Sequence, residues 1–313
     1  MKETTELEIA QILERVAFCA IPINWKSDNP LPGVGERKSN FNGPGYDFRE
    51  IDLFQDGDDV RHINWAVTAR ASDENEMWKT VHQEEKEVKS YVLVKVGHSM
   101  DFGTTRTTKR MLAAEMTASI LFALDKTRDK AGLIVYTRDT PIADVPVSSA
   151  SNVLYPGLTE ILEADPYNLP AFASEGDGLA KALSGLPVSR SLVFIVSDFL
   201  DMSKKDWDEL HEMALYHDVI CIYVQDRREI ELPKPSGIFQ TIGWFYNLSD
   251  YRGASQWIWN SRSTRAQFTA NFRQHEAQVL ASLSERMCES LTVVTDEGDA
   301  AIPRILNLFS SHM

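Results

Sequence analysis

Residues that could do chemistry follow a short apolar stretch near position 90. Residues 91–96 form a nearly continuous valine-rich run that is interrupted only by Lys95, which is typical of a strand covered on both faces. The run ends at Gly97, His98 follows, and a long apolar helix is expected to start near Thr107. A buried strand, a loop of small residues and a helix N-terminus form the ligand-binding edge of a doubly wound α/β sheet. The sequence therefore predicts a functional edge at this point of the chain.

Catalysis at this edge would need a nucleophile next to a base, and His98 with Ser99 is the candidate pair. Side chains of adjacent residues commonly diverge, so we interpret His98 as a solvated loop histidine. The sequence contains no G-x-x-x-x-G-K-[ST] phosphate loop and no His-Glu-x-x-His pair. Gly33 and Gly35 precede charged residues instead of opening a helix after a strand, so they fail as a dinucleotide motif. We therefore expect no catalytic residue and no cofactor.

The composition argues against several classes of partner and location. Lys and Arg total 32 against 46 Asp and Glu, so the formal net charge is -14 and the pI is near 5.0. Nucleic acids and anionic membranes bind clustered basic residues, which argues against both as partners. No apolar run approaches the roughly 18 residues of a spanning helix, and the N-terminus lacks a signal-peptide core. Cys19, Cys221 and Cys288 form no metal-spaced pair. We expect a cytoplasmic protein.

From residue 90 onward, apolar runs of strand length alternate with longer segments of helical periodicity. This order predicts a doubly wound, mostly parallel sheet with helices on both faces. An amphipathic helix over 5–19 precedes it, and an irregular excursion with a hairpin is expected between 227 and 260. The expected strands are 91–96, 132–136, 191–197, 219–224 and 290–295, and the expected helices are 107–127, 156–164, 175–186, 204–216, 262–287 and 301–311.

The chain is expected to have three parts. Residues 1–40 hold the N-terminal helix and a loop rich in Pro and Gly, residues 41–89 a small β subdomain, and residues 90–313 the main α/β domain. Within the subdomain we expect an irregular strand over 48–54, an acidic turn at 56–59, a second extended run over 60–68 and a third over 77–81.

Charged and aromatic residues are unusually dense in this subdomain. One interpretation is a buried salt-bridge network around the turn, since Arg side chains pair well with carboxylates; the other is a surface that docks a partner. We expect the structural role for Arg61 and Trp65, which predicts that Arg61 is buried or paired and that Trp65 is not fully exposed. We also expect Gly57 to have a positive φ, as glycines in acidic turns often do.

Several segments resemble one family, and they occur in its order along the chain. The chain is similar to the domain of unknown function 58 family, bacterial proteins with a von Willebrand factor type A-like domain that are commonly encoded beside AAA+ ATPases of the MoxR type. The matching segments are 45–50, 57–65, 68–70, 99–103, Lys109, 197–199, Asp226 and 232–233, and the family-motif residues in the first three are Asp47, Arg49, Gly57, Asp58, Arg61, Trp65 and Arg70.

The resemblance also implies a metal-ion-dependent adhesion site, built from Asp-x-Ser-x-Ser after the first strand and an aspartate after a later strand. Here the motif is degenerate: Lys95 and Gly97 stand in place of the Asp and the first Ser, whereas Ser99 and Asp198 remain. A cation beside an ammonium group is electrostatically unfavourable, so we expect no bound metal. Instead, the Lys95 ammonium should occupy the cation position, close to Asp198 and Ser99. The alternative is a residual divalent-cation site formed by Ser99, Asp101 and Asp198.

The resemblance implies a non-enzymatic protein-interaction module. Its partner would be a MoxR-type AAA+ ATPase in assembly or chaperone-like work, and a client protein would be a second partner. The acidic surface is compatible with a basic partner. Two alternatives remain open: metal-dependent, adhesion-type ligand binding, and a hydrolase on a doubly wound fold.

Overall fold

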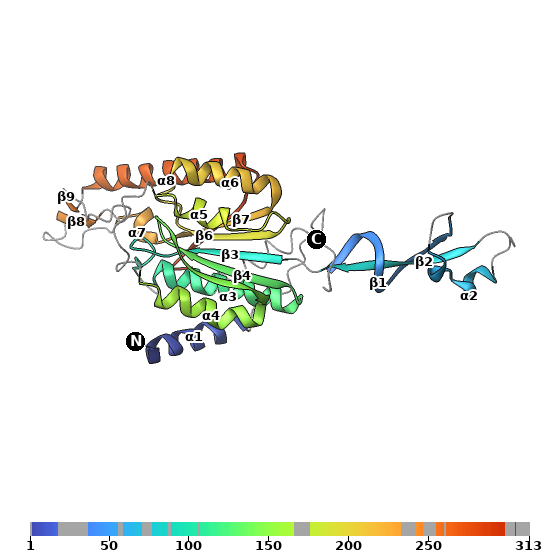
Figure 1. Ribbon diagram of the computed structural model, residues 1–313. Coiled ribbons are helices and arrows are strands. Elements are labelled where there is room, and N and C mark those ends of the chain that lie inside the picture. Colours follow the sequence, from blue (N-terminus) through green and yellow to red (C-terminus); the bar gives the residue numbers. More distant parts are fainter. Residues whose placement is uncertain are drawn as a thin grey trace. The chain divides into compact units, whose positions relative to one another are not determined.

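The computed structural model describes residues 2–17, 37–55, 59–70, 77–86, 89–104, 107–165, 176–232, 242–246, 255–259, 261–297 and 304. The chain divides into two compact units, each with its own internal contacts. The α/β unit comprises Met1–Trp25 and Lys89–Met313, and the hairpin unit comprises Lys26–Val88. Their elements are labelled in Figure 1.

The α/β unit is built on a six-stranded mixed sheet. Its strand order is β10-β7-β6-β3-β4-β5, in which the first five are parallel and β5 pairs antiparallel with β4. The central strands are buried along nearly their whole length. The strands are β3 (Lys89–Lys95), β4 (Lys130–Tyr136), β5 (Pro141–Ser149), β6 (Leu192–Ser197), β7 (Asp218–Gln225) and β10 (Glu289–Val294).

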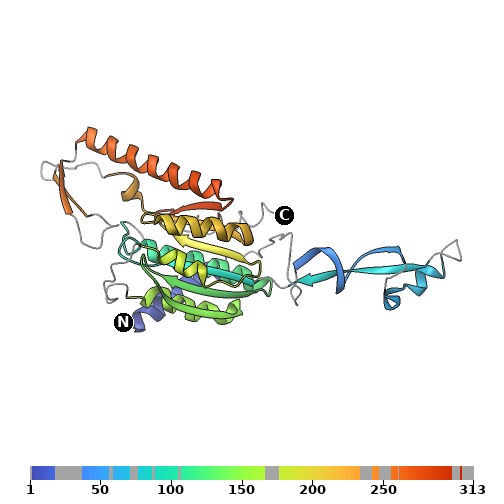
Figure 2. The same cartoon turned by 45° about the horizontal axis from the view of Figure 1, so that its top comes forward.

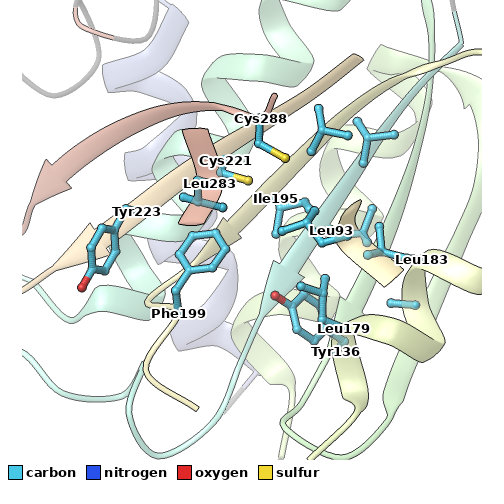
Figure 3. Packing of buried hydrophobic residues seen from close by; sticks show 14 of the residues in the cluster. Leu93, Tyr136, Leu179, Leu183, Ile195, Phe199, Cys221, Tyr223, Leu283 and Cys288 are labelled. Carbon is cyan, nitrogen blue, oxygen red and sulfur yellow. The ribbon is translucent and has the colours of Figure 1, made fainter. Parts of the chain in front are cut away.

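Helices cover both faces of this sheet (Figure 1 and Figure 2). One face carries α1 (Lys2–Ala17), α3 (Lys109–Lys126) and α4 (Ala150–Glu163), and the other carries α5 (Gly178–Ser184), α6 (Lys204–Tyr216) and α8 (Arg262–Glu285). Leu93, Ile195 and Leu283 belong to the buried cluster on the second face (Figure 3). No helix among the described residues is both long and apolar enough to cross a membrane.

Most of the predicted architecture is confirmed. The five expected strands of the sheet are present within two residues at either end, and Ser203 caps α6 through a bond from the backbone N–H of Asp206. The predicted hairpin between 227 and 260 is present as β8 (Ile242–Tyr246) and β9 (Ser255–Trp259). The prediction missed β5, an edge strand with no fully buried residue and no continuous apolar run. The expected helix over 301–311 lies outside the described residues, apart from Arg304.

The N-terminal helix α1 is part of the α/β unit. Ile9, Ile12 and Val16 are buried on one face of the helix, which packs on α3 and α4. The Arg15 guanidinium lies 2.8 Å from a carboxylate oxygen of Glu115 on α3, and the Glu115 side chain is almost fully buried. An apolar face and an ion pair therefore attach α1 to α3 and α4, which cover the same face of the sheet.

Replacing Arg15 with alanine should lower the free energy of unfolding by about 1–3 kcal/mol, because the buried Glu115 carboxylate loses a charged partner. The double variant with Glu115→Gln should recover part of this loss, since a neutral amide is less costly to bury. Denaturant unfolding of the two variants checks both expectations. Equal stability of Arg15→Ala and the wild type would contradict the anchoring role.

The hairpin unit has two long antiparallel strands, β1 (Arg37–Leu53) and β2 (Trp78–Lys86), with several register shifts between them. The second extended run expected over 60–68 is wrong. That segment forms a 3₁₀ turn, η1 (Val60–His62), and a short helix, α2 (Trp65–Thr68). Asp59 and Asn64 explain the difference, because each side chain caps the element that follows it.

The expected burial of Trp65 is also wrong, since Trp65 is 66% exposed. The Arg61 side chain is 87% exposed and lies 3.8 Å from a carboxylate oxygen of Asp59. The described hairpin unit is a two-stranded ribbon with no second layer to cover these residues. Arg70 is exposed as well. Gly57 and Asp58 lie outside the described residues, and for Asp47 and Arg49 only the backbone in β1 is described.

Candidate functional site

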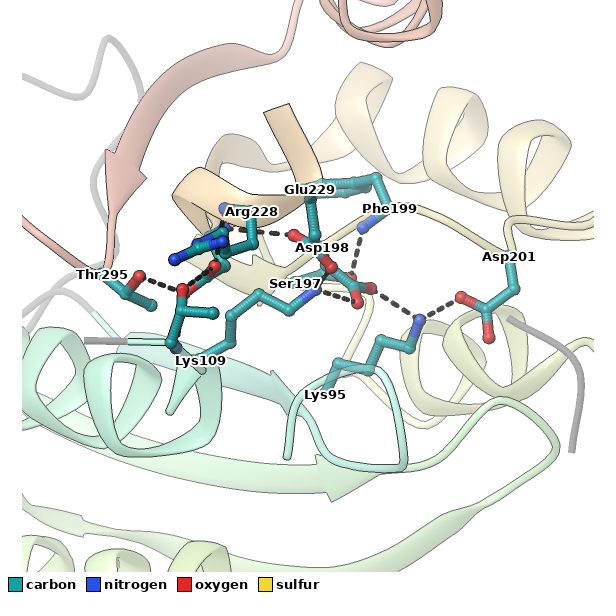
Figure 4. Close-up of polar contacts among 11 residues, drawn as sticks. Lys95, Lys109, Ser197, Asp198, Phe199, Asp201, Arg228, Glu229 and Thr295 are labelled. Carbon is teal, nitrogen blue, oxygen red and sulfur yellow. Dashed lines mark hydrogen bonds and ion pairs between the residues drawn. The ribbon is translucent and has the colours of Figure 1, made fainter. Parts of the chain in front are cut away.

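Charged side chains meet at the carboxyl edge of the parallel sheet (Figure 4). Lys95 is the last residue of β3, Asp198 directly follows β6, Asp226 directly follows β7, and Thr295 directly follows β10. Carboxyl ends of parallel strands lie at one edge, so residues distant in sequence come together here. β4, the next strand along the chain, pairs with one side of β3, and β6 pairs with the other side of β3. The cluster therefore lies where the strand order reverses, which is the usual ligand position in open α/β sheets.

Lys95 pairs with the aspartate that the sequence assigned to it. Its ammonium nitrogen lies 2.8 Å from Oδ1 of Asp198, and it also contacts Asp201. The side chains of Lys95 and Asp198 are both almost fully buried. The buried Ser99 side chain lies near the Asp198 carboxylate and helps to lower its pKa. The expected neighbourhood of Lys95, Asp198 and Ser99 is confirmed.

Lys109 is a second internal cation, to which the sequence analysis assigned no role. It is the first residue of α3, after the capping residue Thr108. Its ammonium nitrogen lies 3.0 Å from Oδ2 of Asp198 and 2.6 Å from Oε1 of Glu229, and the side chain is fully buried. A lysine at a helix N-terminus opposes the helix dipole. That unfavourable position was the available signal that Lys109 has specific carboxylate partners.

Electrostatics keep the cluster ionised. Burial alone would raise the pKa of Asp198, but the ammonium groups of Lys109 and Lys95 overcome this effect and hold the pKa well below its usual range. Burial would lower the pKa of Lys95, yet the carboxylates of Asp198 and Asp201 raise it above the ordinary lysine value. The pKa of Glu229 is raised, chiefly by burial. Asp198 is thus neutralised from both sides by side chains of this chain.

The turn that presents Asp198 has an unusual backbone. Phe199 has a φ of 46°, in the left-handed region that residues other than glycine rarely adopt. Its N–H donates to the Ser197 hydroxyl at 3.1 Å, and its buried ring meets Tyr223 edge-on at 5.8 Å. Packing of the Phe199 ring therefore stabilises the tight turn that aims Asp198 at the two lysines.

Asp226 ties three further segments together beside this cluster. As the capping residue of α7 (Arg227–Ile230), it accepts a bond from the backbone N–H of Arg228. It also accepts bonds from the hydroxyl and N–H of Thr104 and from the Thr295 hydroxyl. Its own N–H donates to Oε2 of Glu229 at 3.1 Å. Glu229 thereby links the Asp226 network to Lys109 and the rest of the cluster.

The arrangement is compact. A small pocket beside Lys95, lined also by Tyr136, Ser197, Asp201 and Asp206, has room for about one water molecule. Among the described residues, no group of three or more His, Cys, Asp or Glu side chains is arranged to hold a metal ion. Chemically, the cluster can lock the loops at the ends of β3, β6 and β7 through ion pairs.

Among known protein families, the one described as "Protein of unknown function DUF58" matches residues 50–278, which is most of the chain. The chain belongs to this family.

Curated relatives in this DUF58 family are themselves uncharacterised. The proteins Mb1516 of Mycobacterium bovis and Rv1480 of Mycobacterium tuberculosis are each 32% identical to the chain over 209 residues. The match covers 65% of this chain and 63% of each relative, so the chain spans less than two thirds of the length of these relatives.

Solved structures offer only distant likenesses to this DUF58 chain. BatB from Bacteroides thetaiotaomicron is 13% identical, with 72% of this chain and 98% of that one covered and a TM-score of 0.44. An aerotolerance-related membrane protein from Bacteroides fragilis is 12% identical, with 72% and 99% covered and the same TM-score. These values are too low to assign a function or to confirm a von Willebrand factor A-like fold.

Other candidate residues of this DUF58 chain lie on the segment that follows β3. The Asp101 carboxylate pairs with Arg110 on α3, at 2.5 Å from Nε and 2.8 Å from Nη2. His98 is exposed on the loop. Gly97 has a φ of 148°, a conformation that favours glycine. The structure therefore places Ser99 beside Asp198 and pairs Asp101 with Arg110.

Proposed function

We propose that the chain is a non-enzymatic protein-interaction module with a von Willebrand factor A-like α/β unit. In this proposal it acts in the cytoplasm as a partner or adaptor of an AAA+ ATPase of the MoxR type. Membership of the DUF58 family supports the proposal, because proteins of that kind are commonly encoded beside such ATPases.

The exposed apolar surface of the hairpin unit is the observation that carries the proposal. Val60 and Trp65 are each 66% exposed, and both belong to the family motif. Ile51, Leu53 and Met77 in the same unit are exposed as well. Large apolar side chains that are exposed on one small unit favour a protein-binding surface, and tryptophan is among the residues that contribute most to binding energy. We name Val60, Trp65 and Met77 with the exposed Arg61 the docking surface.

The strand-end cluster supports a structural role for the α/β unit in this function. Lys95 and Lys109 engage both carboxylate oxygens of Asp198, so this carboxylate has ion-pair partners within the chain. Because ion pairs within the chain hold the strand-end edge together, we assign a structural role to the α/β unit. Partner recognition is assigned to the hairpin unit. The net charge of -14 favours a partner with a basic surface.

Changing Trp65 to serine should abolish partner binding and leave the melting temperature of the chain nearly unchanged, because an exposed side chain contributes little to folding. The measurement is recovery of an AAA+ ATPase from native cytoplasm on the immobilised chain, with and without ATP. Val60→Ser is a second variant of the docking surface and should also lose partner binding. Its matched control is Val188→Ser, since Val188 is an exposed valine of the α/β unit.

The supporting outcome is recovery of an AAA+ ATPase by the wild type and by Val188→Ser, and its loss with Trp65→Ser and Val60→Ser. Equal recovery with all four proteins would contradict the docking surface. Absence of any AAA+ ATPase from the wild-type sample, in both nucleotide conditions, would contradict the proposed partner.

A further inference from the structure

Two cysteines that are far apart in sequence meet in the core of the α/β unit. Cys221 lies in the middle of β7, and Cys288 directly precedes the neighbouring strand β10. Ser290 is the register partner of Cys221, so Cys288 stands two residues earlier on the adjacent strand. Figure 3 shows both sulfur atoms in the same core cluster. Both cysteines are free thiols, and their side chains lie close together in the core.

We propose that Cys221 and Cys288 form a thiol–disulfide site, in which a hydroperoxide oxidises Cys288 first and Cys221 then closes an intrachain disulfide. The site lies away from Lys95 and Asp198 and is independent of the proposed partner. Its product would covalently join the edge strand β10 to β7.

The environments of the two thiols assign their order of reaction. Cys221 is completely buried, and burial raises the pKa of its thiol well above the usual range. Cys288 has a pKa below the usual value, because the Cys221 thiol and the Arg286 guanidinium both lie near its sulfur. Arg286 is held in place over the Trp207 ring, at 5.1 Å, and by a bond from Nε to the Trp207 carbonyl at 3.1 Å. The thiolate is the nucleophile, so Cys288 reacts first.

Access also favours Cys288. It is 5% exposed, and its neighbour Met287 is well exposed, with a φ of 56° at the turn between α8 and β10. In the described sheet β10 is an edge strand, paired only with β7. Edge elements open more readily than central ones, so a small oxidant reaches this sulfur before it reaches the interior of β7.

The chemistry balances with one peroxide. The Cys288 thiolate attacks one peroxide oxygen and the O–O bond breaks, which gives a sulfenic acid and hydroxide; the hydroxide takes up a proton to become water. Cys221 then attacks the sulfenic sulfur and loses its own proton, and the sulfenic oxygen leaves as a second water. Two thiols and one hydrogen peroxide thus become one disulfide and two waters.

The test treats the full-length chain with hydrogen peroxide and follows it by intact mass and by peptide mapping without reductant. The expected result is a loss of two hydrogens per chain, a linked peptide containing Cys221 and Cys288, and reversal by dithiothreitol. Oxidation of the exposed Met287 in the same sample reports that oxidant was sufficient. A wild-type chain with oxidised Met287 and no Cys221–Cys288 link would overturn the proposal.

Two variants test the order of reaction. Cys221→Ala should leave a Cys288 sulfenic acid that dimedone traps, whereas Cys288→Ala should leave Cys221 unmodified. Alanine is used because it tolerates burial, and circular dichroism verifies that each variant is folded. Trapping at Cys221 in folded Cys288→Ala would overturn the assigned order. A wild-type disulfide that contains Cys19 in place of either partner would overturn the site itself.

Discussion

Replacing Lys109 with methionine is expected to lower the free energy of unfolding by about 3–5 kcal/mol, the usual cost of removing one partner from a buried ion pair. The ammonium nitrogen lies 3.0 Å from Asp198 and 2.6 Å from Glu229, in a fully buried position. Methionine has a similar length and no charge, so it leaves two carboxylates with less compensation at little change in volume. Denaturant unfolding of the variant and the wild type measures the effect.

The matched control is Lys205→Met. Lys205 is also paired with an aspartate, Asp177 at 3.0 Å, but its side chain is 63% exposed, so solvent screens the pair and its loss should have little effect. A second variant, Lys109→Met with Glu229→Gln, should recover part of the stability because one uncompensated charge is removed. Equal stability of Lys109→Met and Lys205→Met would contradict the role of Lys109.

The destabilisation in Lys109→Met should also depend on pH. The pKa of Asp198 is lower in the folded chain than in the unfolded chain, so its ion pairs contribute fully above the unfolded value of about 3.9. That contribution is lost as the pH falls through the folded pKa, because a protonated Asp198 no longer needs an ammonium partner. The difference between the variant and the wild type should therefore shrink below about pH 4.

The sheet was predictable because buried parallel strands appear as continuous apolar runs. β6 and β7 are buried along their entire length or nearly so, and both were expected within one residue of their observed ends. β5 was not predictable by the same rule, since its exposed residues interrupt its pattern and it begins at Pro141. Proline in a sheet is confined to edge strands, to the first residue of a strand and to bulges, and the edge becomes visible only once the sheet is assembled.

The candidate site was predictable in part. A lysine within a valine-rich strand requires a carboxylate partner, and the family pattern placed Asp198 next to Lys95. Asp201 and Glu229 follow their strands on short connections, so their approach to the lysines depends on tertiary packing. Trp65 misled the prediction because large aromatic side chains are usually buried, whereas a two-stranded ribbon provides no layer to bury it.

Lys95→Asp is expected to make the stability of the chain depend on a divalent cation. The Lys95 ammonium lies 2.8 Å from Asp198 and contacts Asp201. The shorter side chain would vacate that position and place a third carboxylate next to these two. Oxygen ligands around a vacated position suit magnesium. Without the cation, repulsion between the carboxylates should lower the melting temperature well below that of the wild type.

Magnesium should then restore stability in proportion to its binding, by about 2.7 kcal/mol at a concentration one hundred times its Kd. Thermal melts in chelator and in rising magnesium check this for Lys95→Asp, with Lys95→Met as the matched control. Both variants lose the ammonium group, but only Lys95→Asp gains an oxygen ligand, so only its melting temperature should rise with magnesium. An equal magnesium response in Lys95→Asp, Lys95→Met and the wild type would contradict the idea that the Lys95 ammonium takes the place of a bound metal cation.

Adding Gly97→Ser to Lys95→Asp would recreate the Asp-x-Ser-x-Ser pattern of the adhesion site but should not improve the response. A side chain at Gly97 would meet no atom within 4 Å, so space is available. The obstacle is the backbone, because the φ of 148° is one that residues with a side chain rarely adopt. The double variant should therefore melt below Lys95→Asp in chelator. A higher melting temperature for the double variant, in chelator or in magnesium, would mean that the loop relaxes once the lysine is gone, and that Lys95 itself imposes the conformation of Gly97.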